Sequence, residues 1–478
     1  MSASNGFALG RNLLIRTDSY KASHWLQYPP GAEINFSYVE SRGGLFSHAL
    51  FFGLQAYLRE YLATPVTMDD IHEAASLFAA HGVPFNQEGW RNLVRKHAGR
   101  LPIRIRAVPE GSVIPVHQAM LTVENTDPEF YWLTSYLETE MLRAIWYPTT
   151  VATLSAVVKT IILRYLEQTS DDPHGQIPFK LHDFGARGVS SLESAALGGM
   201  AHLVNFQGTD TVTALLAARR YYDEPMAGFS IPAAEHSTIT SWGREHERDA
   251  YRNMLQQFAQ PNKVLAVVSD SYDIYQACEH IWGQELRDEV VQSGATVVIR
   301  PDSGDPTETV LQVTQILARQ FGTTTNSKGY RVLKHVRIIQ GDGMNFRSIE
   351  ECLAKLVQHQ FSADNIAFGM GGGLLQQVNR DTMKFAMKCS ALRVNGQWRD
   401  VFKSPVGDKG KASKAGRLEL VRTPDGKLAT KRSDQVVATD TSLFETVYEN
   451  GRCLKTSSFA EVRQRASEGL VSLRLIEQ

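Results

Sequence analysis

Residues 264–305 read VLAVVSDSYDIYQACEHIWGQELRDEVVQSGATVVIRPDSGD, and this stretch decides the fold. Its runs VLAVV (264–268) and TVVI (296–299) are apolar throughout instead of alternating, which is typical of parallel strands covered on both faces. A helical stretch separates the two runs, and a loop of Ser, Asp, Arg or Gly follows each one. The stretch therefore predicts a β/α unit with a polar loop at the carboxyl end of each strand.

The same pattern occurs five more times between residues 178 and 385. The further strand candidates are KLHDFG (180–185), LVNFQG (203–208), GFSIPAAE (228–235), VRIIQGD (336–342) and NIAFGMGGG (365–373). Seven such strands favour an α/β fold in which residues 151–384 form an irregular β/α, TIM-like barrel. Functional groups are then expected on the loops at the carboxyl ends of the strands.

Both flanks of this region carry a different pattern. Residues 101–124 and 385–432 hold short strand candidates, and the VNGQ (394–397) and TPDG (423–426) turns mark hairpins. We therefore expect a second, mainly antiparallel β domain built from both chain ends, residues 1–150 together with residues 385–478.

Composition excludes several classes of partner. The 478 residues include 50 basic and 51 acidic side chains, and this balance gives no reason to expect a nucleic acid or an acidic membrane as partner. No apolar run reaches the ~18 residues of a membrane span. The four cysteines stand singly, which favours reduced thiols over disulfides or a zinc site. We expect a cytoplasmic protein.

A glycine-rich loop is the first candidate for a phosphate site. Residues 369–373, GMGGG, follow a strand and open a helical segment, so backbone N–H groups can approach an anion closely. Arg380 lies seven residues beyond Gly373 and could add a charge-assisted bond. The alternative is a plain tight turn.

Acidic loops follow three of the strands. IRPDSGDP carries Arg300, Asp302 and Asp305, a set that suits a ribose diol and a metal-bound diphosphate. VVSDSYD (267–273) and IQGDG (339–343) also place carboxylates at strand ends. Each carboxylate alone is more often a helix cap than a ligand, but several such loops in one barrel are hard to assign to capping alone.

Three other strand ends carry candidate side chains. His236 follows Glu235 after the strand GFSIP, where a structural histidine is the alternative to a catalytic one. Phe184 could belong to the core or stack on a flat ring beside Arg187. Asp210 stands in the next loop. No GxxxxGK[ST], HExxH or GxSxG motif is present, which argues against a P-loop kinase, a zincin and an α/β-hydrolase.

Taken together, these segments resemble the nicotinamide phosphoribosyltransferase family almost from end to end. The matching motifs include TDSYK (17–21), KLHDFG, PAAEHSTIT (232–240), VSDSYDIY (268–275), IRPDSG (299–304), IQGDG and NIAFG (365–369). The resemblance implies a type II phosphoribosyltransferase fold and a homodimer with shared active sites. It also implies transfer of the phosphoribosyl group of phosphoribosyl pyrophosphate (PRPP) to nicotinamide in NAD salvage, with Mg²⁺ and with ATP-coupled phosphorylation of one histidine.

The resemblance also implies roles for the residues around the pyridine ring. His236 resembles the phosphorylated histidine, and Asp273 resembles the acid that partners it and contacts Mg²⁺ through water while the diphosphate holds the ion. Phe184 and Tyr20 of the partner subunit resemble the aromatic faces that enclose the ring. Asp210 resembles the acceptor for the carboxamide.

Other residues match the positions that bind ribose and phosphate. Ser269 is expected to face the ring pocket. Arg187 and Arg300 resemble the ligands of diphosphate and ribose. Asp302 and Asp342 resemble ribose ligands, and Gly341 belongs to the loop that carries Asp342. The remaining matches are the 5′-phosphate cradle of Gly371, Gly372 and Arg380, and the basic residues around the phosphates, Arg42, Lys388, Lys403 and Lys411, several of them from the partner subunit.

The sequence departs from the animal members of the family at three places. The segment GGLFSHAL (43–50) after Arg42 is shorter than their basic, polar loop, which puts regulation or surface interactions in doubt. Ala186 stands where they carry Tyr, and Met370 where they carry Ser, so details of the ring pocket or phosphate loop could differ.

Two rival functions stay open at this point. Nicotinate phosphoribosyltransferase has the same chemistry, but the carboxylate of Asp210 would repel the carboxylate of nicotinate by a few kcal/mol when desolvated. A non-enzymatic nucleotide-binding protein on the same fold would not need the full set of Asp, Arg, Gly and His loops.

Overall fold

The structure, a computed structural model, describes residues 11–404 and 412–470. The chain divides into two compact units. The first unit comprises residues 1–153, 220–224 and 379–478, and the second comprises residues 154–219 and 225–378. Both the long helix α5 (Glu138–Thr169) and helix α8 (Val212–Tyr222) have residues in both units.

A parallel sheet of six strands forms the centre of the second unit. Its order is β7 (Gly208–Thr209), β6 (Leu181–Asp183), β13 (Ile366–Met370), β12 (Val336–Gln340), β9 (Thr296–Arg300) and β8 (Val264–Val268), and every neighbouring pair is parallel. Apolar side chains are buried on both faces of β8, β9 and β12, as the continuous apolar runs predict. The predicted α/β class with a parallel sheet is confirmed.

The regular sheet is smaller than the predicted barrel. The segment LVNFQG begins with Leu203, the last residue of helix α7 (Leu192–Leu203), and contributes only the short strand β7 at its end. The segment GFSIPAAE forms no regular strand, and Pro232 cannot donate a ladder hydrogen bond. Instead it makes two isolated parallel bridges, Phe229 with Gly208 of β7 and Ala233 with Ala266 of β8. These bridges link both edges of the sheet, but a full TIM barrel is not confirmed among the described residues.

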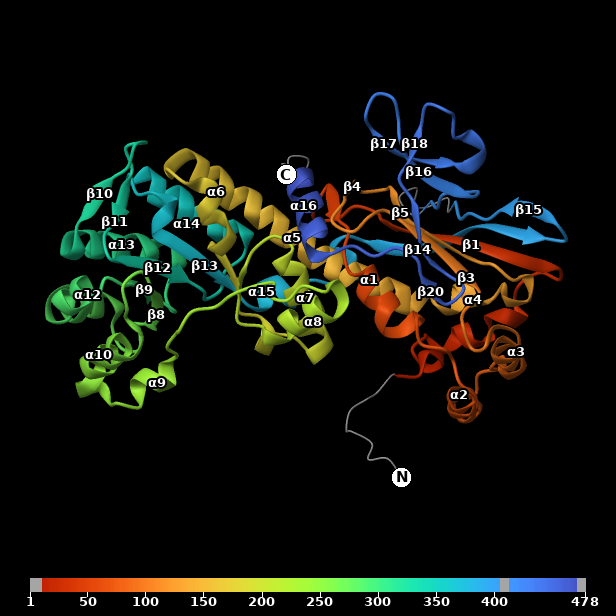
Figure 1. The fold of residues 1–478 in the computed structure, drawn as a ribbon, viewed down its shortest axis with the longest axis horizontal. Coiled ribbons are helices and arrows are strands. Elements are labelled where there is room, and N and C mark those ends of the chain that lie inside the picture. Colours follow the sequence, from red (N-terminus) through yellow and green to blue (C-terminus); the bar gives the residue numbers. More distant parts are fainter. Residues whose placement is uncertain (1–10, 405–411, 471–478) are drawn as a thin grey trace. The chain divides into compact units, whose positions relative to one another are not determined.

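Helices follow most of the parallel strands. Helices α13 (Pro306–Phe321) and α14 (Phe346–Gln358) pack beside each other, and α13 also contacts β12 (Figure 1). Further helices of this unit include α6 (Pro173–Gln176), α9 (His236–Thr240), α10 (Glu247–Phe258), α11 (Ile274–Gln276), η8 (Ala277–Glu285), α12 (Arg287–Ser293) and α15 (Gly372–Leu375). A small antiparallel pair joins β10 (Thr323–Thr325) to β11 (Arg331–Leu333).

Antiparallel strands from both chain ends form the main sheet of the first unit. Its order is β15 (Gln397–Asp400), β14 (Phe385–Val394), β1 (Ala32–Ser41), β5 (Ala119–Asn125), β3 (Ile103–Ala107), β19 (Glu445–Glu449) and β20 (Arg452–Cys453). The red strand β1 lies between β14 and β5 in Figure 1, which brings residues far apart in sequence together. A separate antiparallel sheet is therefore confirmed.

The predicted hairpins are present in this unit. Asn395 and Gly396 have φ values of 47° and 77°, so the VNGQ turn joins β14 to β15 in the left-handed conformation that these residues favour. The TPDG turn joins β16 (Leu418–Arg422) to β17 (Leu428–Arg432), and β18 (Thr441–Ser442) completes a second sheet. The remaining elements include η2 (Ser19–Leu26), β2 (His48–Leu50), α1 (Leu54–Tyr57), α2 (Met68–His81), α3 (Gln87–His97), β4 (Val113–Pro115), α4 (Leu133–Tyr136) and α16 (Phe459–Gly469).

Helix α5 is, among the described residues, the one helix long and apolar enough by length and composition to cross a membrane. The structure buries 72% of its most apolar 18-residue window inside the protein. This burial is what the core helix of a globular protein shows.

Candidate active site

A cavity of about 520 Å³ opens at the carboxyl ends of the parallel strands in the second unit. Polar loops from β6, β7, β9, β12 and β13 line it together with the start of α9. The predicted site residues that it brings together are Phe184, Arg187, Asp210, His236, Arg300, Asp302, Gly341, Asp342 and Gly371. The cavity therefore collects side chains from across the second unit at one edge of the sheet.

Phe184 forms an apolar wall of this cavity. Its ring packs against the cluster of Ala266, Val298 and Ile339, and its backbone N–H donates to Met370 O at 2.9 Å. Gly369 makes room for the ring, because a Cβ atom there would lie 2.1 Å from the Phe184 ring. The ring is thus held in place with one side toward the cavity, where it can stack on a flat aromatic substrate.

Asp210 lies at the edge of the same wall. Its backbone N–H donates to Asp183 O at 3.0 Å, and its Oδ1 accepts from the Ser230 hydroxyl at 2.5 Å. His182 lines the cavity beside Phe184, and burial lowers the pKa of His182, so its imidazole is neutral at pH 7. Sequence reasoning did not single out Ser230 or His182.

His236 is the first residue of α9, where the Glu235–Thr238 capping box fixes the start of the helix. Its Nδ1 lies 3.2 Å from Ser271 Oγ. Its Nε2 lies 3.4 Å from an oxygen of Asp302 and 3.7 Å from Oδ1 of Asp270. The imidazole is half-exposed and stands between a hydroxyl and two carboxylates.

The carboxylates close to His236 in this structure are those of Asp302 and Asp270, and the predicted role of Asp273 stays a prediction. Asp273 Oδ1 accepts from the N–H groups of Tyr275 and Gln276 and so caps α11. Asp270 Oδ2 accepts from the Asp302 N–H at 3.0 Å and from the Ser303 hydroxyl, whereas its buried Oδ1 has no hydrogen-bond partner among the described residues. In the SDSYD loop, Asp273 therefore caps α11, whereas Asp270 lies beside His236.

Ser269 is not among the residues that line this cavity, and its expected place in the ring pocket stays a prediction. Ser269 is fully buried, and its hydroxyl donates to Val267 O and accepts from Trp282 Nε1 at 3.0 Å. Side chains alternate along a strand, and Ala266 of β8 lines the cavity. Residues 267 and 269 consequently point to the opposite face of the sheet.

Arg300 and Asp302 form the polar edge at the end of β9. The Arg300 guanidinium donates to Asp302 Oδ1 at 2.7 Å and lies 5.8 Å from the centre of the Phe184 ring. The pair puts a cation and a carboxylate side by side next to the aromatic wall. This arrangement suits a substrate that carries both hydroxyl groups and an anionic group.

The glycine-rich loop reaches the cavity at Gly371, directly before α15. A Cβ atom on Gly372 would meet nothing within 4 Å, so this backbone is open to a ligand. The turn that carries Arg187 approaches the loop closely, because a Cβ on Gly188 would lie 3.3 Å from Gly372 N. The two predicted phosphate-binding segments are therefore neighbours.

The remaining predicted residues belong to the first unit. Tyr20 is 58% exposed, and Arg380 pairs with Asp381 in the short helix η10 (Arg380–Thr382). Lys411 lies outside the described residues.

Two of the predicted basic residues of the first unit, Arg42 and Lys388, lie close to acidic side chains. Arg42 Nε donates to Glu40, but its buried Nη2 has no hydrogen-bond partner among the described residues. Burial lowers the pKa of Lys388, which lies 3.8 Å from Glu138. The backbone N–H of Lys403 donates to Ser413.

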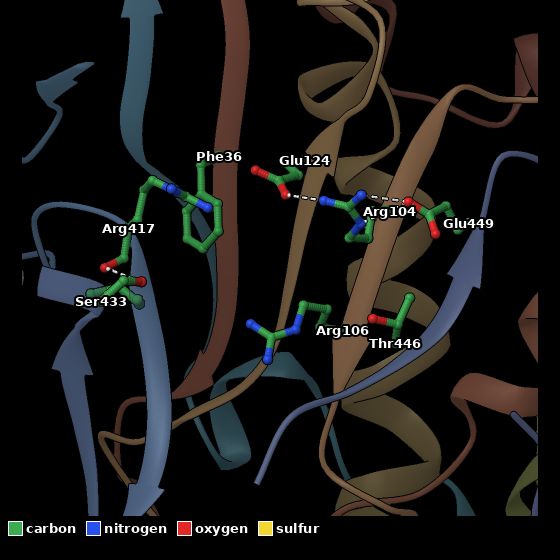
Figure 2. Close-up of a pocket in the computed structure, with 9 residues that line it drawn as sticks. Phe36, Arg104, Arg106, Glu124, Arg417, Ser433, Thr446 and Glu449 are labelled. Atoms are coloured by element: carbon green, nitrogen blue, oxygen red, sulfur yellow. Dashed lines mark hydrogen bonds and ion pairs between the residues drawn. The ribbon is translucent and has the colours of Figure 1, made fainter. Parts of the chain in front are cut away.

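A second cavity, of about 410 Å³, lies in the first unit. Figure 2 shows Arg104 between Glu124 and Glu449, and it forms ion pairs with both. Arg106 forms an ion pair with Glu419 at 2.6 Å. These arginine charges are matched by carboxylates, and none of the predicted site residues lines this cavity. The cavity of the second unit is therefore the candidate active site.

Two family models match this chain. Residues 179–452 match the nicotinate phosphoribosyltransferase (NAPRTase) family, and residues 12–105 match the N-terminal domain of nicotinamide phosphoribosyltransferase. The first match contains every predicted site residue except Tyr20 and Arg42.

Curated relatives extend the similarity over nearly the whole chain. A nicotinamide phosphoribosyltransferase of Xanthomonas campestris pv. campestris (strain 8004) is 59% identical over 460 residues, which cover 95% of this chain and 98% of the relative. One from Acinetobacter baylyi is 31% identical and covers 97% of this chain and 98% of the relative.

Solved structures share the fold at low sequence identity. The nicotinate-nucleotide pyrophosphorylase of Pyrococcus furiosus has a TM-score of 0.61 at 14% identity, with coverage of 99% of this chain and 100% of the other. Human nicotinic acid phosphoribosyltransferase has a TM-score of 0.58 at 20% identity, with coverage of 96% and 94%.

Proposed function

The chain belongs to the nicotinamide phosphoribosyltransferase family, and from this we propose that it transfers the 5-phosphoribosyl group of PRPP to nicotinamide. The products are nicotinamide mononucleotide and diphosphate, as needed in NAD salvage. The observation that carries the proposal is the single cavity that holds Phe184, Asp210, Arg300, Asp302 and Gly371 together. We infer that the sheet around this cavity closes into an irregular barrel, in which residues 229–233 form the seventh strand-like element.

Nicotinamide binds against the Phe184 ring, with Tyr20 of the partner subunit on its other face. The carboxylate of Asp210 accepts a hydrogen bond from the carboxamide NH₂, because an ionised carboxylate is an acceptor only. This contact directs the ring nitrogen away from Asp210 and toward the ribose of PRPP. In this proposal the protein is a homodimer with shared active sites, and the exposure of Tyr20 agrees with a contact to a second subunit.

PRPP binds with its 5′-phosphate at Gly371 and Gly372 and its ribose hydroxyls at Asp302 and Asp342. Arg187 and Arg300 neutralise the diphosphate. The basic side chains Arg42, Lys388, Lys403 and Lys411, several from the partner subunit, surround the phosphates together with Arg380.

The reaction needs no enzyme nucleophile. The bond between ribose C1 and the diphosphate oxygen breaks with its electron pair on the diphosphate, and the lone pair of the pyridine nitrogen forms the new bond to C1 with inversion. No proton moves in this step. The residues of the site accelerate it by positioning the two substrates and by neutralising the charge that develops on the leaving group.

Mg²⁺ fits the site as an ion carried mainly by the diphosphate. The described residues contain no group of three or more His, Cys, Asp or Glu side chains that could hold a metal ion. The buried, unpartnered Oδ1 of Asp270 is an oxygen donor of the kind that Mg²⁺ contacts through water. The ion would supply further neutralisation of the leaving diphosphate.

His236 is the residue that ATP phosphorylates in this proposal. A phosphoryl group on its exposed imidazole would add negative charge beside Asp270 and Asp302 and favour binding of Mg²⁺ with PRPP. We also infer that the protein is cytoplasmic and binds neither nucleic acid nor membrane. Its four cysteines, which are all free, agree with a reducing compartment.

The test is mononucleotide formation by the purified protein with PRPP, Mg²⁺ and either nicotinamide or nicotinate, each with and without ATP. Product from nicotinamide alone, increased by ATP and lost with a chelator, is the expected result. In His236→Ala the reaction without ATP should persist while its stimulation by ATP disappears. Product from nicotinate alone would identify the alternative, a nicotinate phosphoribosyltransferase, and absence of both products would refute the enzymatic proposal.

A further inference from the structure

The side chains of Ser230 and Asp210 meet just beyond a short piece of parallel pairing. Phe229 N–H donates to Gln207 O at 2.7 Å, and Thr209 N–H donates to Phe229 O at 3.0 Å. This isolated bridge between Phe229 and Gly208 continues into two residues that both line the cavity, Asp210 and Ser230. The bridge therefore holds the two segments together, and the side chains of Asp210 and Ser230 are in contact where both line the cavity.

The Ser230 hydroxyl donates to Oδ1 of Asp210 at 2.5 Å. Among the described residues no other side chain donates a hydrogen bond to this carboxylate, and no cation forms an ion pair with it. The Asp210 backbone is held separately by Asp183 O. The rotation of the carboxylate about its own side-chain bond is thus controlled by Ser230.

A hydroxyl group has one proton, and the 2.5 Å contact with Asp210 Oδ1 is far shorter than the 3.5 Å contact with Ile231 O, so the proton is directed to Asp210. Toward the cavity, Asp210 Oδ2 and the free lone pair of Ser230 Oγ can only accept hydrogen bonds. This edge of the pocket is satisfied by a substituent that donates, such as the NH₂ of a carboxamide. A carboxylate substituent finds no donor here and faces a negative charge.

We propose that Ser230 is a specificity-determining residue, which positions the Asp210 carboxylate and makes this edge of the pocket select a carboxamide over a carboxylate. The inference rests on the proposed function, since it concerns the choice between nicotinamide and nicotinate. It assigns the selectivity to the Ser230–Asp210 pair and not to Asp210 alone. Ser230 acts on the substrate chiefly through the orientation of Asp210.

Because Ser230 is exposed, a substitution there can change substrate specificity without disturbing the fold. Its side chain lies at the surface of the cavity and outside the buried core, so Ser230→Ala leaves no hole in the packing. Ser230→Thr keeps the hydroxyl and is the conservative variant. Ser237→Ala is a matched control, because Ser237 also lines the cavity but donates its hydroxyl to Glu235.

The experiment measures kcat and KM for nicotinamide, nicotinate and PRPP in these variants. Ser230→Ala should lower the ratio of kcat/KM for nicotinamide over nicotinate about tenfold, as expected for loss of one hydrogen bond to a charged group. The change should lie in the KM for nicotinamide, with the KM for PRPP unaltered. Ser230→Thr should retain at least half of the wild-type ratio, and Ser237→Ala should leave it unchanged.

A double-mutant cycle with Asp210→Asn supplies the second readout. If Ser230 acts through Asp210, Ser230→Ala should have little further effect in the Asp210→Asn background. An unchanged ratio in Ser230→Ala, or full additivity with Asp210→Asn, would overturn the inference. The assay of the wild-type protein tests the proposed function separately. If the wild-type protein did not use nicotinamide, the proposed function would fail whatever the Ser230 variants do.

Discussion

The buried carboxylate of Asp270 accepts a hydrogen bond from the backbone N–H of Asp302 at 3.0 Å. This bond joins the loop after β8 to the loop after β9 and fixes the start of the segment that carries Asp302. It leaves Oδ1 of Asp270 without a partner and 3.7 Å from Nε2 of His236. One carboxylate thereby organises both the histidine and the acidic loop beside it.

Replacement of this carboxylate should affect coupling to ATP more than the basal reaction. We expect Asp270→Asn to lower the stimulation by ATP about tenfold or more, because its amide Nδ2 would face either His236 or the N–H of Asp302. The measurement is the rate of mononucleotide formation with and without ATP. Asp273→Asn is the matched control and should keep the stimulation, since asparagine caps a helix as well as aspartate does. Equal losses in both variants would contradict this assignment.

Asp210→Asn should relax the preference for nicotinamide. An amide side chain removes the negative charge and can donate its NH₂ to the carboxylate of nicotinate. We expect the kcat/KM ratio of nicotinamide over nicotinate to fall roughly 10- to 100-fold, corresponding to ~1.4–3 kcal/mol. Competition between the two substrates in one reaction measures the ratio directly. Asp288→Asn, on the exposed side of α12, is the control, and selectivity that survived Asp210→Asn would disprove the role of Asp210.

The strand-end pattern predicted which loops meet at the site but not which side chains face it. Continuous apolar runs identified β8, β9 and β12, and the rule that parallel strands end at one edge brought Phe184 and Arg300 together. The choice between Asp270 and Asp273 depended on which residue the following helix uses as its cap. That choice is set by the local path of the loop, which residue types alone do not reveal.

Two other differences between the predicted and the observed structure could in part have been foreseen from the sequence. The alternation along β8, with Ala266 in the cavity, directs Ser269 to the other face of the sheet, and counting residues back from the loop would have indicated this. Pro232 marks GFSIPAAE as an irregular segment. Nothing in the sequence indicates that Ser230 meets Asp210, because their contact depends on a bridge between segments about 20 residues apart.

Gly369 should control nicotinamide affinity through Phe184. A Cβ at position 369 would lie 2.1 Å from the Phe184 ring, so Gly369→Ala must displace the ring from the wall that it forms. We expect the KM for nicotinamide to rise about tenfold or more, with a smaller change for PRPP. Steady-state kinetics with each substrate varied in turn gives both values.

The pairing of these residues can be checked by a second substitution. Phe184→Leu removes the ring atoms that clash, and it should itself raise the KM for nicotinamide by loss of the stacking surface. Gly369→Ala should then add little in the Phe184→Leu background. Two independent, additive effects would show that Gly369 acts by some route other than the ring.

Lys180 should make the stability of the second unit depend on pH. Its ammonium group is buried and donates to the carbonyl oxygens of Ala363, Asp364 and Ile366, and burial lowers the pKa of Lys180 to about 7. The unfolded chain keeps this lysine near its ordinary pKa of about 10.4, so it binds more protons than the folded chain between pH 7 and 10. Stability must rise with pH across this window, by at most ~1.4 kcal/mol per pH unit from this group.

The variant Lys180→Met isolates this contribution. It should be less stable than the wild type at every pH, because three carbonyl groups lose their donor. It should also lack the increase in the free energy of unfolding with pH that Lys180 causes. Urea unfolding of the full chain at pH 7, 8 and 9 should therefore show a wild-type advantage that grows with pH. Lys263→Met, at an exposed position, should follow the wild-type pH profile. If Lys180→Met also ran parallel to the wild type, Lys180 would titrate alike in the folded and unfolded chain, and its burial would not govern its charge.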